Sequence, residues 1–334
     1  MSGLPRQPTR PDQHHGLTDR VNGRARVIPP YPPRLGRTWG IVALLAMAIL
    51  AAAACGPRSG ATPSGASTLR VVATTTVFAD MVRNVGGYRV TVTSIIPSGA
   101  GPEDYEPKPN DARKLADADL MVSNGAGLDD FLDGLIDAAG ERAATRLVLG
   151  DGIPAITVDG TVNPHFWLDP SLVAGHYVPA IAAALTGLDP AGAAIYDASA
   201  RSYAAEIEAM DAANEARIGT IPIGDRKLVT FHDAFPYFAA HYGFGVVGVI
   251  LENVGQEPTA SDLAALVETV KAAGVRAVFS EAQFSSELAR TLAEEAGVTR
   301  VVTTLYNDTV GPPPTDTYLT MMRWNVDEIV QALG

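Results

Sequence analysis

The sequence predicts an α/β protein with two lobes, each with a parallel β-sheet flanked by helices, joined by one long rigid linking helix. From Leu69 onward, short β-branched runs alternate with segments of helical period, and the second half of the chain repeats the order of the first. An Ala-rich segment, residues 189–219, separates the halves and has no strand signal. With 334 residues, of which 47% are hydrophobic, the chain is long enough for two moderate cores.

Charge is distributed unevenly along the chain. The formal net charge is -12, and residues 1–55 hold seven Arg and two Asp, or +5, so the remainder carries -12 - 5 = -17. An acidic body repels nucleic acid and anionic lipid headgroups and attracts cations. We therefore expect a cation as partner and no nucleic acid.

The N-terminal segment has the pattern of a secretion signal. About fifteen apolar residues follow Arg34 and Arg37 and end in small residues and Cys55. The segment resembles a bacterial lipoprotein signal, in which the Cys is lipidated, although the usual Leu is absent from Ala52–Cys55. An uncleaved single-span anchor is the alternative. Either way, we expect an extracytoplasmic body on the outer face of the cytoplasmic membrane, and one Cys allows no internal disulfide.

A small-residue tether, 56–68, leads from this leader, 1–55, into the first lobe, 69–188. Val residues make the first strand, and Phe78, Met81 and Val82 fall on one face of the helix that follows. Pro97 ends the second strand, and Asn110 is the expected N-cap of the next helix. The expected strands are 69–74, 88–97 and 119–125, and the expected helices are 77–87, 110–118 and 128–140.

The second lobe, 220–334, opens with a copy of this pattern. Residues 226–244 read as a strand, a polar junction and a helix that ends at a Gly, as at the start of the first lobe. A capping box of Thr259 and Asp262 predicts the start of a later helix. The remaining expected strands are 246–252, 275–281 and 298–305, and the remaining expected helices are 259–274 and 285–297. If helical throughout, the linking segment 189–219 spans roughly 40 Å.

Five stretches resemble successive blocks of one protein family, the zinc/manganese-specific solute-binding lipoproteins of ABC transporters. They are PSGAGPEDYEPKPND, NPHFWLDP, VTFHDAFPYFAAHYGF, VFSEAQFSSELARTLAEEAG and YLTMMRWNVDEIVQAL, and the similarity covers residues 69–334. The resemblance implies two lobes with a divalent metal ion held between them. It also implies a lipid-anchored monomer that delivers the ion to an ABC permease.

The resemblance also implies four metal ligands. Glu103 matches the first position, where the family usually has a His, and His165 matches the second, in NPHFW. His232 matches the third, in TFHDAF, and Asp308 matches the fourth, in a short loop before the last helix. Each follows or ends an expected strand, and ligands bind at the carboxyl ends of strands in open α/β sheets.

Donor chemistry agrees with a divalent ion. Two imidazoles and two carboxylates balance a charge of +2 and suit first-row metals. We expect Zn²⁺, with Mn²⁺ a close second, because carboxylates suit Mn²⁺ but the affinity order places Zn²⁺ higher. Metal affinity should fall as the pH drops through roughly 6.5, because only neutral imidazole binds metal.

Each of these residues also has an ordinary structural interpretation. Glu103 can belong to a solvated Pro-rich turn, His165 can cap the helix that starts near Asp169, His232 can cap its own helix, and Asp308 can be a turn residue. We expect His176 and His241 to be packing or surface residues. Further acidic candidates at strand ends are Glu106, Glu252, Glu257 and Glu281.

Two other functions stay open at this point. A zinc-dependent hydrolase would need an open coordination position and a base such as Glu106 or Glu281. The chain has no HExxH, GxSxG or P-loop pattern, so we expect a binding protein and not an enzyme. A surface adhesin is the third possibility.

Overall fold

The structure is a computed structural model that describes residues 68–102, 105–139, 144–158, 160–251 and 256–334. All of these belong to one compact unit, Gly65–Gly334. Cys55 and the rest of the leader, Glu103 and Glu252 lie outside the described residues. The boundaries predicted for the two lobes stay a prediction.

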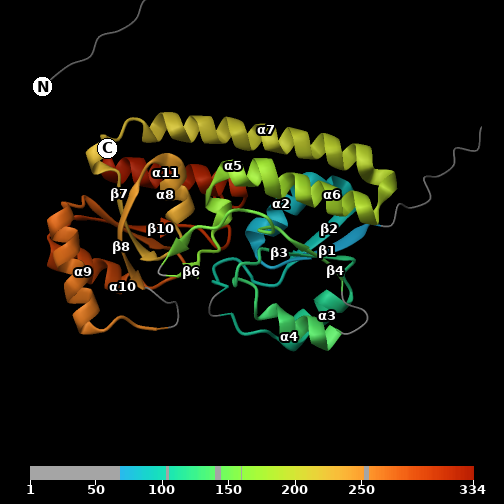
Figure 1. The fold of residues 1–334 in the computed structure, drawn as a ribbon, viewed down its shortest axis with the longest axis horizontal. Coiled ribbons are helices and arrows are strands. Elements are labelled where there is room, and N and C mark those ends of the chain that lie inside the picture. The colour runs from blue at the N-terminus through green and yellow to red at the C-terminus, as the bar shows by residue number, and fades with distance from the viewer. Residues whose placement is uncertain (1–67, 103–104, 140–143, 159, 252–255) are drawn as a thin grey trace, which may run out of the picture. The chain divides into compact units, whose positions relative to one another are not determined.

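The first sheet has four parallel strands in the order β2-β1-β3-β4. Alternate residues of a strand point to opposite faces, so Val71 packs on one side and Val72 on the other. Figure 1 shows α3 and α4 on one side of this sheet and α2 and α6 on the other. The bounds are β1 (Leu69–Ala73), α2 (Thr76–Gly86), β2 (Val90–Ser94), α3 (Pro109–Ala116), β3 (Leu120–Ser123), α4 (Leu132–Ala139) and β4 (Thr145–Val148).

The second half repeats this topology. Strand β7 pairs in parallel with β8, β9 pairs in parallel with β10, and β7 neighbours β9. The resulting order, β8-β7-β9-β10, matches that of the first sheet, so the predicted fold class is confirmed. The bounds are β7 (Lys227–His232), α8 (Pro236–Tyr242), β8 (Gly245–Leu251), α9 (Ala260–Ala273), β9 (Ala277–Glu281), α10 (Glu287–Ala296), β10 (Arg300–Leu305) and α11 (Tyr318–Leu333).

A crossing segment links the sheets. It contains a small antiparallel hairpin and a long apolar helix that packs against α2 and α7. By length and composition alone, the stretch Pro170–Leu188 could cross a membrane, but here it lies against other helices of the fold. The bounds are β5 (Thr157–Val158), β6 (Thr161–Val162), α5 (Pro170–Leu172), a π-turn (Val173–Tyr177) and α6 (Val178–Leu188).

The predicted linking helix is α7, Ala193–Ile218, which runs along the top of Figure 1. Its 26 residues span roughly 40 Å. It packs against α2 and α6 from the first half and α11 from the second. A stripe at helical spacing faces the core, and it consists of Tyr196, Ala200, Tyr203, Ile207, Met210, Asn214 and Ile218. The helix is therefore fixed along its length to both sheets.

Close packing fixes the start of α7. Arg89 donates from Nε to Oδ2 of Asp189 at 2.7 Å, and the Tyr196 hydroxyl donates to the same oxygen at 2.7 Å. A Cβ on Gly192 would lie 2.5 Å from that oxygen and 2.6 Å from the Arg89 Nε. Only glycine fits between these groups, so the turn into the helix depends on its missing side chain.

Two helix starts differ from the prediction, and one agrees. Asn110 is not the N-cap of α3, because the helix begins at Pro109 and the Asp111 carboxylate accepts from the Lys108 backbone N–H at 2.9 Å. A Pro at the first helical position and an acid at the third place the N-cap at Lys108, two residues before Asn110. Helix α4 begins at Leu132 rather than at residue 128. The capping box of Thr259 and Asp262 is confirmed.

His241, expected to be a packing or surface residue, lies in an ionic cluster between α8, α7 and the start of α5. Its Nε2 is 2.9 Å from Oδ1 of Asp211, and its Nδ1 is 3.1 Å from Oδ1 of Asp169. The hydrogen bond to Asp211 raises the pKa of His241, and the charges of Asp169 and Glu215 raise it further. The protonated ring can then donate to a carboxylate on each side.

This cluster predicts a pH-dependent contribution to stability. Because the pKa of His241 is raised in the folded protein, its stabilisation is complete below a pH of roughly 6.5 and is lost as the pH rises through the raised pKa. We expect His241→Gln to lower the free energy of unfolding by about 2 kcal/mol at pH 6 and by less at pH 9. Urea denaturation at both pH values measures this.

The matched control for this prediction is His176→Gln. His176 places Nε2 2.8 Å from the backbone carbonyl oxygen of Asp151, and the cluster of carboxylates around His241 does not include it. The same pH dependence in both variants would contradict the role given to Asp169 and Asp211.

Candidate metal centre

Three of the four predicted ligands converge in the structure. The Nε2 atoms of His165 and His232 are 3.4 Å apart, and they lie 3.5 Å and 3.9 Å from the Asp308 carboxylate oxygens. One ligand atom from each residue lies within 4.8 Å of the others, and all three residues are buried. This spacing is compatible with one ion bound by all three. Glu103 lies outside the described residues.

The three side chains come from the ends of strands. His232 is the last residue of β7, Asp308 follows β10, and His165 follows β6 directly before the 3-10 turn Phe166–Leu168. Strand order reverses between β7 and β9, and the carboxyl ends of such strands form the usual binding edge of an α/β sheet. The fold topology therefore presents His232 at this edge.

The ring of His165 is oriented by Asn163. The Asn163 Nδ2 donates to the backbone carbonyl of Asp233 at 2.6 Å, so its Oδ1 is the atom that faces His165 Nδ1 at 3.0 Å. Because Oδ1 can only accept, Nδ1 carries the proton. The lone pair of His165 is then on Nε2, which faces Asp308 and His232.

The ring of His232 is oriented by a longer chain of contacts. Gln283 donates from Nε2 to Asp308 Oδ2 at 2.8 Å and to Asn307 Oδ1 at 2.9 Å. With its Oδ1 used as acceptor, Asn307 directs Nδ2 at His232 Nε2, 3.2 Å away. Nε2 therefore accepts, so Nδ1 carries the proton, and this nitrogen lies 3.1 Å from Oε1 of Glu281.

Of the further acidic candidates that lie within the described residues, Glu281 is the one that contacts the cluster. It ends β9, is 1% exposed, and contacts Nδ1 of His232, on the side of the ring opposite to Nε2. A carboxylate in this position orients a ligating His and increases electron donation from the ring to the metal. Glu106 and Glu257 are exposed, and neither belongs to the cluster of His165, His232 and Asp308 in the described part of the chain.

The ordinary interpretations of two ligands do not hold. Helix α5 is capped by Asp169, which accepts from the Ser171 N–H at 2.8 Å, and His165 makes no such cap. The N-cap position of α8 is occupied by Phe235, three residues after His232. Both imidazoles are thus directed into the cluster rather than used at a helix end.

The loop that carries Asp308 is fastened to the first half of the chain. The Trp167 indole Nε1 donates to the Asn307 carbonyl at 2.8 Å, and Gly99 N donates to Thr309 Oγ1 at 3.0 Å. Val310 N donates to Thr76 Oγ1 at 3.0 Å. Asp80 of α2 accepts from the first backbone N–H of α11, at Tyr318, at 2.9 Å. Asp308 thus belongs to the second half in sequence but is positioned by the first.

A surface hollow of about 450 Å³ reaches the edge of this site. It is lined by the loop after β2, including Gly99 and Tyr105, and by Gln283 and Phe284 after β9. Gln283 joins it to the cluster through its hydrogen bond to Asp308.

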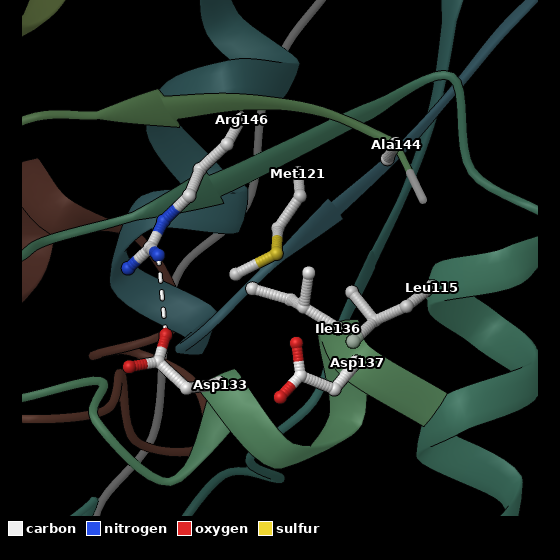
Figure 2. Close-up of a pocket in the computed structure, with 7 residues that line it drawn as sticks. All are labelled: Leu115, Met121, Asp133, Ile136, Asp137, Ala144 and Arg146. Atoms are coloured by element: carbon white, nitrogen blue, oxygen red, sulfur yellow. Dashed lines mark hydrogen bonds and ion pairs between the residues drawn. The ribbon is translucent and has the colours of Figure 1, made fainter. Parts of the chain in front are cut away.

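A second cavity lies away from the ligands. Figure 2 shows it on the side of the first sheet covered by α3 and α4, with Met121 and Ile136 at its apolar part and an ion pair between Arg146 and Asp133 at its rim. Its volume is about 330 Å³, and none of its lining residues belongs to the cluster of ligands. The ligand cluster is therefore the stronger candidate for the functional site.

Sequence reasoning missed three residues of this site. Asn163, Gln283 and Asn307 contact the candidate ligands, and proximity in sequence is a signal only for Asn163 and Asn307. Asn163 lies two residues before His165, and Asn307 directly precedes Asp308. Gln283 is far from every ligand in sequence and gave no signal.

Known proteins resemble this chain along most of its length. The family model for the periplasmic zinc-uptake complex component A matches residues 71–332. The manganese-binding lipoprotein MntA of Halalkalibacterium halodurans is 33% identical over 288 residues, which are 85% of this chain and 95% of that protein. The iron ABC transporter substrate-binding lipoprotein MtsA of Streptococcus pyogenes is 27% identical over 90% of this chain and 100% of its own length.

Solved structures show the same fold. The Mn-bound periplasmic metal-binding protein of Candidatus Liberibacter asiaticus is 26% identical with a TM-score of 0.73, over 80% of this chain and 100% of that one. The periplasmic zinc-binding protein TroA of Treponema pallidum is 26% identical with a TM-score of 0.74, over 80% of this chain and 99% of that one. Since the family model matches most of the chain and MntA exceeds 30% identity along it, this chain belongs to the zinc-uptake component A family, the extracytoplasmic metal-binding lipoproteins of ABC transporters.

Proposed function

We propose that this protein captures one divalent transition-metal ion with Glu103, His165, His232 and Asp308 and delivers it to an ABC permease. The observation that carries the proposal is the convergence of three of these side chains within 4.8 Å in a buried position. A lipid on Cys55 and the tether 56–68 would keep the body near the permease as a monomer. That proximity raises the effective concentration and compensates for weak docking.

Charge balance supports a divalent ion at this position. Two imidazoles in neutral form contribute nitrogen ligands, and the carboxylates of Asp308 and Glu103 together neutralise a charge of +2. Burial of Asp308 beside the two rings makes a cation there favourable, because a buried carboxylate needs compensation. The acidic composition of the chain also attracts cations.

We propose Zn²⁺ as the tighter ligand and Mn²⁺ as the runner-up. Zinc lies above manganese in the affinity order for a site of nitrogen and oxygen donors. Manganese is the ion named for MntA and for the bound form of the Liberibacter protein, and zinc is named for TroA. Selection between them would then depend on which ion is available outside the cell.

Binding accounts for the site better than hydrolysis does. A hydrolase needs a base next to a metal-bound water. Glu281 contacts Nδ1 of His232, which faces away from the ion position, and Glu106 is exposed. Both candidates for the base are therefore poorly placed, and we propose that the protein is not an enzyme.

Removing a ligand should reduce metal affinity sharply. We expect His165→Ala and His232→Ala each to weaken Zn²⁺ and Mn²⁺ binding by at least about 10-fold, since each lost nitrogen removes one coordination bond. Competition with a chromogenic chelator, together with elemental analysis of the purified body 56–334, measures this. His176→Ala removes a histidine outside the cluster and should leave affinity unchanged. Wild-type affinity in both ligand variants would disprove the site.

The carboxylate behind His232 should matter as well. Glu281→Gln keeps an acceptor for Nδ1 but removes the negative charge, so we expect metal affinity to fall about 10-fold without loss of folding. Isothermal titration with Zn²⁺ and a thermal melt separate these two effects. Glu257→Gln changes an exposed glutamate by the same chemistry and should bind as the unmodified protein does. Equal affinity in the two variants would refute the role of Glu281.

A further inference from the structure

Asn307 contacts the nitrogen with which His232 would bind metal. Its Nδ2 lies 3.2 Å from His232 Nε2, and both residues are buried. An amide N–H that donates to Nε2 uses the single lone pair of that atom. A metal ion needs the same lone pair, so the hydrogen bond and the metal bond exclude one another.

Gln283 holds Asn307 in this orientation. Asp308 Oδ2 accepts from the Gln283 amino group at 2.8 Å, and the same amino group donates to Asn307 Oδ1 at 2.9 Å. If the Asn307 amide turned over, its NH₂ would face the NH₂ of Gln283, and both groups would be donors without an acceptor. Asn307 therefore directs a donor, and not an oxygen ligand, at the metal position.

The main chain around Asn307 is fixed on both sides. The Asn307 carbonyl accepts from Trp167 Nε1 at 2.8 Å. The neighbouring Tyr306 exchanges two hydrogen bonds with Asn325 of α11, from its N–H at 3.0 Å and to its carbonyl at 2.6 Å. Because the backbone is held, Asn307 can leave His232 by rotation of its side chain while the loop stays in place.

We propose that Asn307 is a competing hydrogen-bond donor that weakens metal binding at His232, with Gln283 as the residue that holds it in the competing orientation. Capture of an ion is then an exchange of His232 Nε2 from Asn307 to the metal, and release is the reverse exchange. The proposal rests on the metal-binding function above and adds a residue that opposes binding. A delivery protein gains from such a competitor, because release leaves His232 with a partner rather than with an unsatisfied nitrogen.

The direction in which metal affinity changes when Asn307 is substituted tests this proposal. We expect Asn307→Ala to bind Zn²⁺ and Mn²⁺ about 3- to 10-fold more tightly, the factor expected when one net hydrogen bond no longer has to be broken. Transfer of the bound ion to excess chelator, followed by stopped flow, should be slower by a similar factor. A residue that only supports the fold would give weaker binding and faster transfer.

Two further variants isolate the effect. Asn307→Ser shortens the side chain and so withdraws the donor from His232 Nε2 while a polar group remains, and it should change affinity in the same direction. Thr309→Ala lies on the same loop and removes its bond to Gly99 without touching His232, so it should bind no more tightly than the unmodified protein. Circular dichroism and a thermal melt confirm that each variant is folded.

Failure of this inference is distinct from failure of the metal site. Unchanged or weaker binding in both Asn307 variants, with His165→Ala still weakened, overturns the competing role and leaves the site intact. Tighter binding in Thr309→Ala as well would assign the effect to a loosened loop and also overturn it. Unchanged binding in His165→Ala and His232→Ala would instead disprove the site on which the inference depends.

Discussion

The hydrogen bond from the Trp167 indole to the Asn307 carbonyl joins the two parts of the metal centre. Trp167 lies two residues after His165, and Asn307 lies one residue before Asp308. This contact of 2.8 Å ties the segment of one candidate ligand to the loop that carries another. The hydrogen bonds of Thr309 to Gly99 and of Val310 to Thr76 hold the same loop to the first half, so together they support the 3.5 Å separation between His165 and Asp308.

The packing around the candidate site restrains the movement of the two sheets relative to each other. A single buried core cluster runs from Phe78 in α2 through Tyr203 in α7 to Ile329 in α11, so the two sheets share apolar packing. Helix α7 contacts helices of both halves along its 26 residues. A wide opening of the sheets would expose this core at a cost of about 25 cal/mol per Å². Exchange of metal by local movements at the ligands costs less.

The sequence predicts the order of strands and helices well. It says much less about which hydrogen bonds cap the helices and orient the side chains of the site. Strand-helix alternation and the repeat at residues 226–244 predicted both sheets. This was possible because the hydrophobic period that distinguishes a strand from a helix can be read within a short stretch of sequence. Asn110 was the wrong cap for α3, because Asp111 at the third helical position competes with it and Pro109 can start the helix. That choice depends on hydrogen bonds rather than on hydrophobic pattern.

At the candidate site, too, the sequence indicated which residues take part but not what orients them. Family resemblance identified His165, His232 and Asp308, and the structure brings these residues together. The partners that orient them come from positions such as Gln283, which lies 25 residues from Asp308 and 51 from His232 in sequence (308 - 283 and 283 - 232). No local pattern encodes a contact over such separations. The contacts of Gln283 exist because β9 and β10 pair in parallel and bring the segments that follow them together.

The two histidines differ in a way that bears on release. Nδ1 of His165 faces the neutral amide of Asn163, whereas Nδ1 of His232 faces the carboxylate of Glu281. A carboxylate close to the ring increases electron donation from it more than an amide does, so of the two proposed nitrogen ligands we expect His232 to be the stronger. Asn307 opposes that stronger ligand, and so the competing donor acts at the bond whose loss most weakens the hold on the ion. The carboxylate of Glu281 beside Nδ1 would thus favour capture of the ion by His232, and the amide of Asn307 beside Nε2 would favour its release.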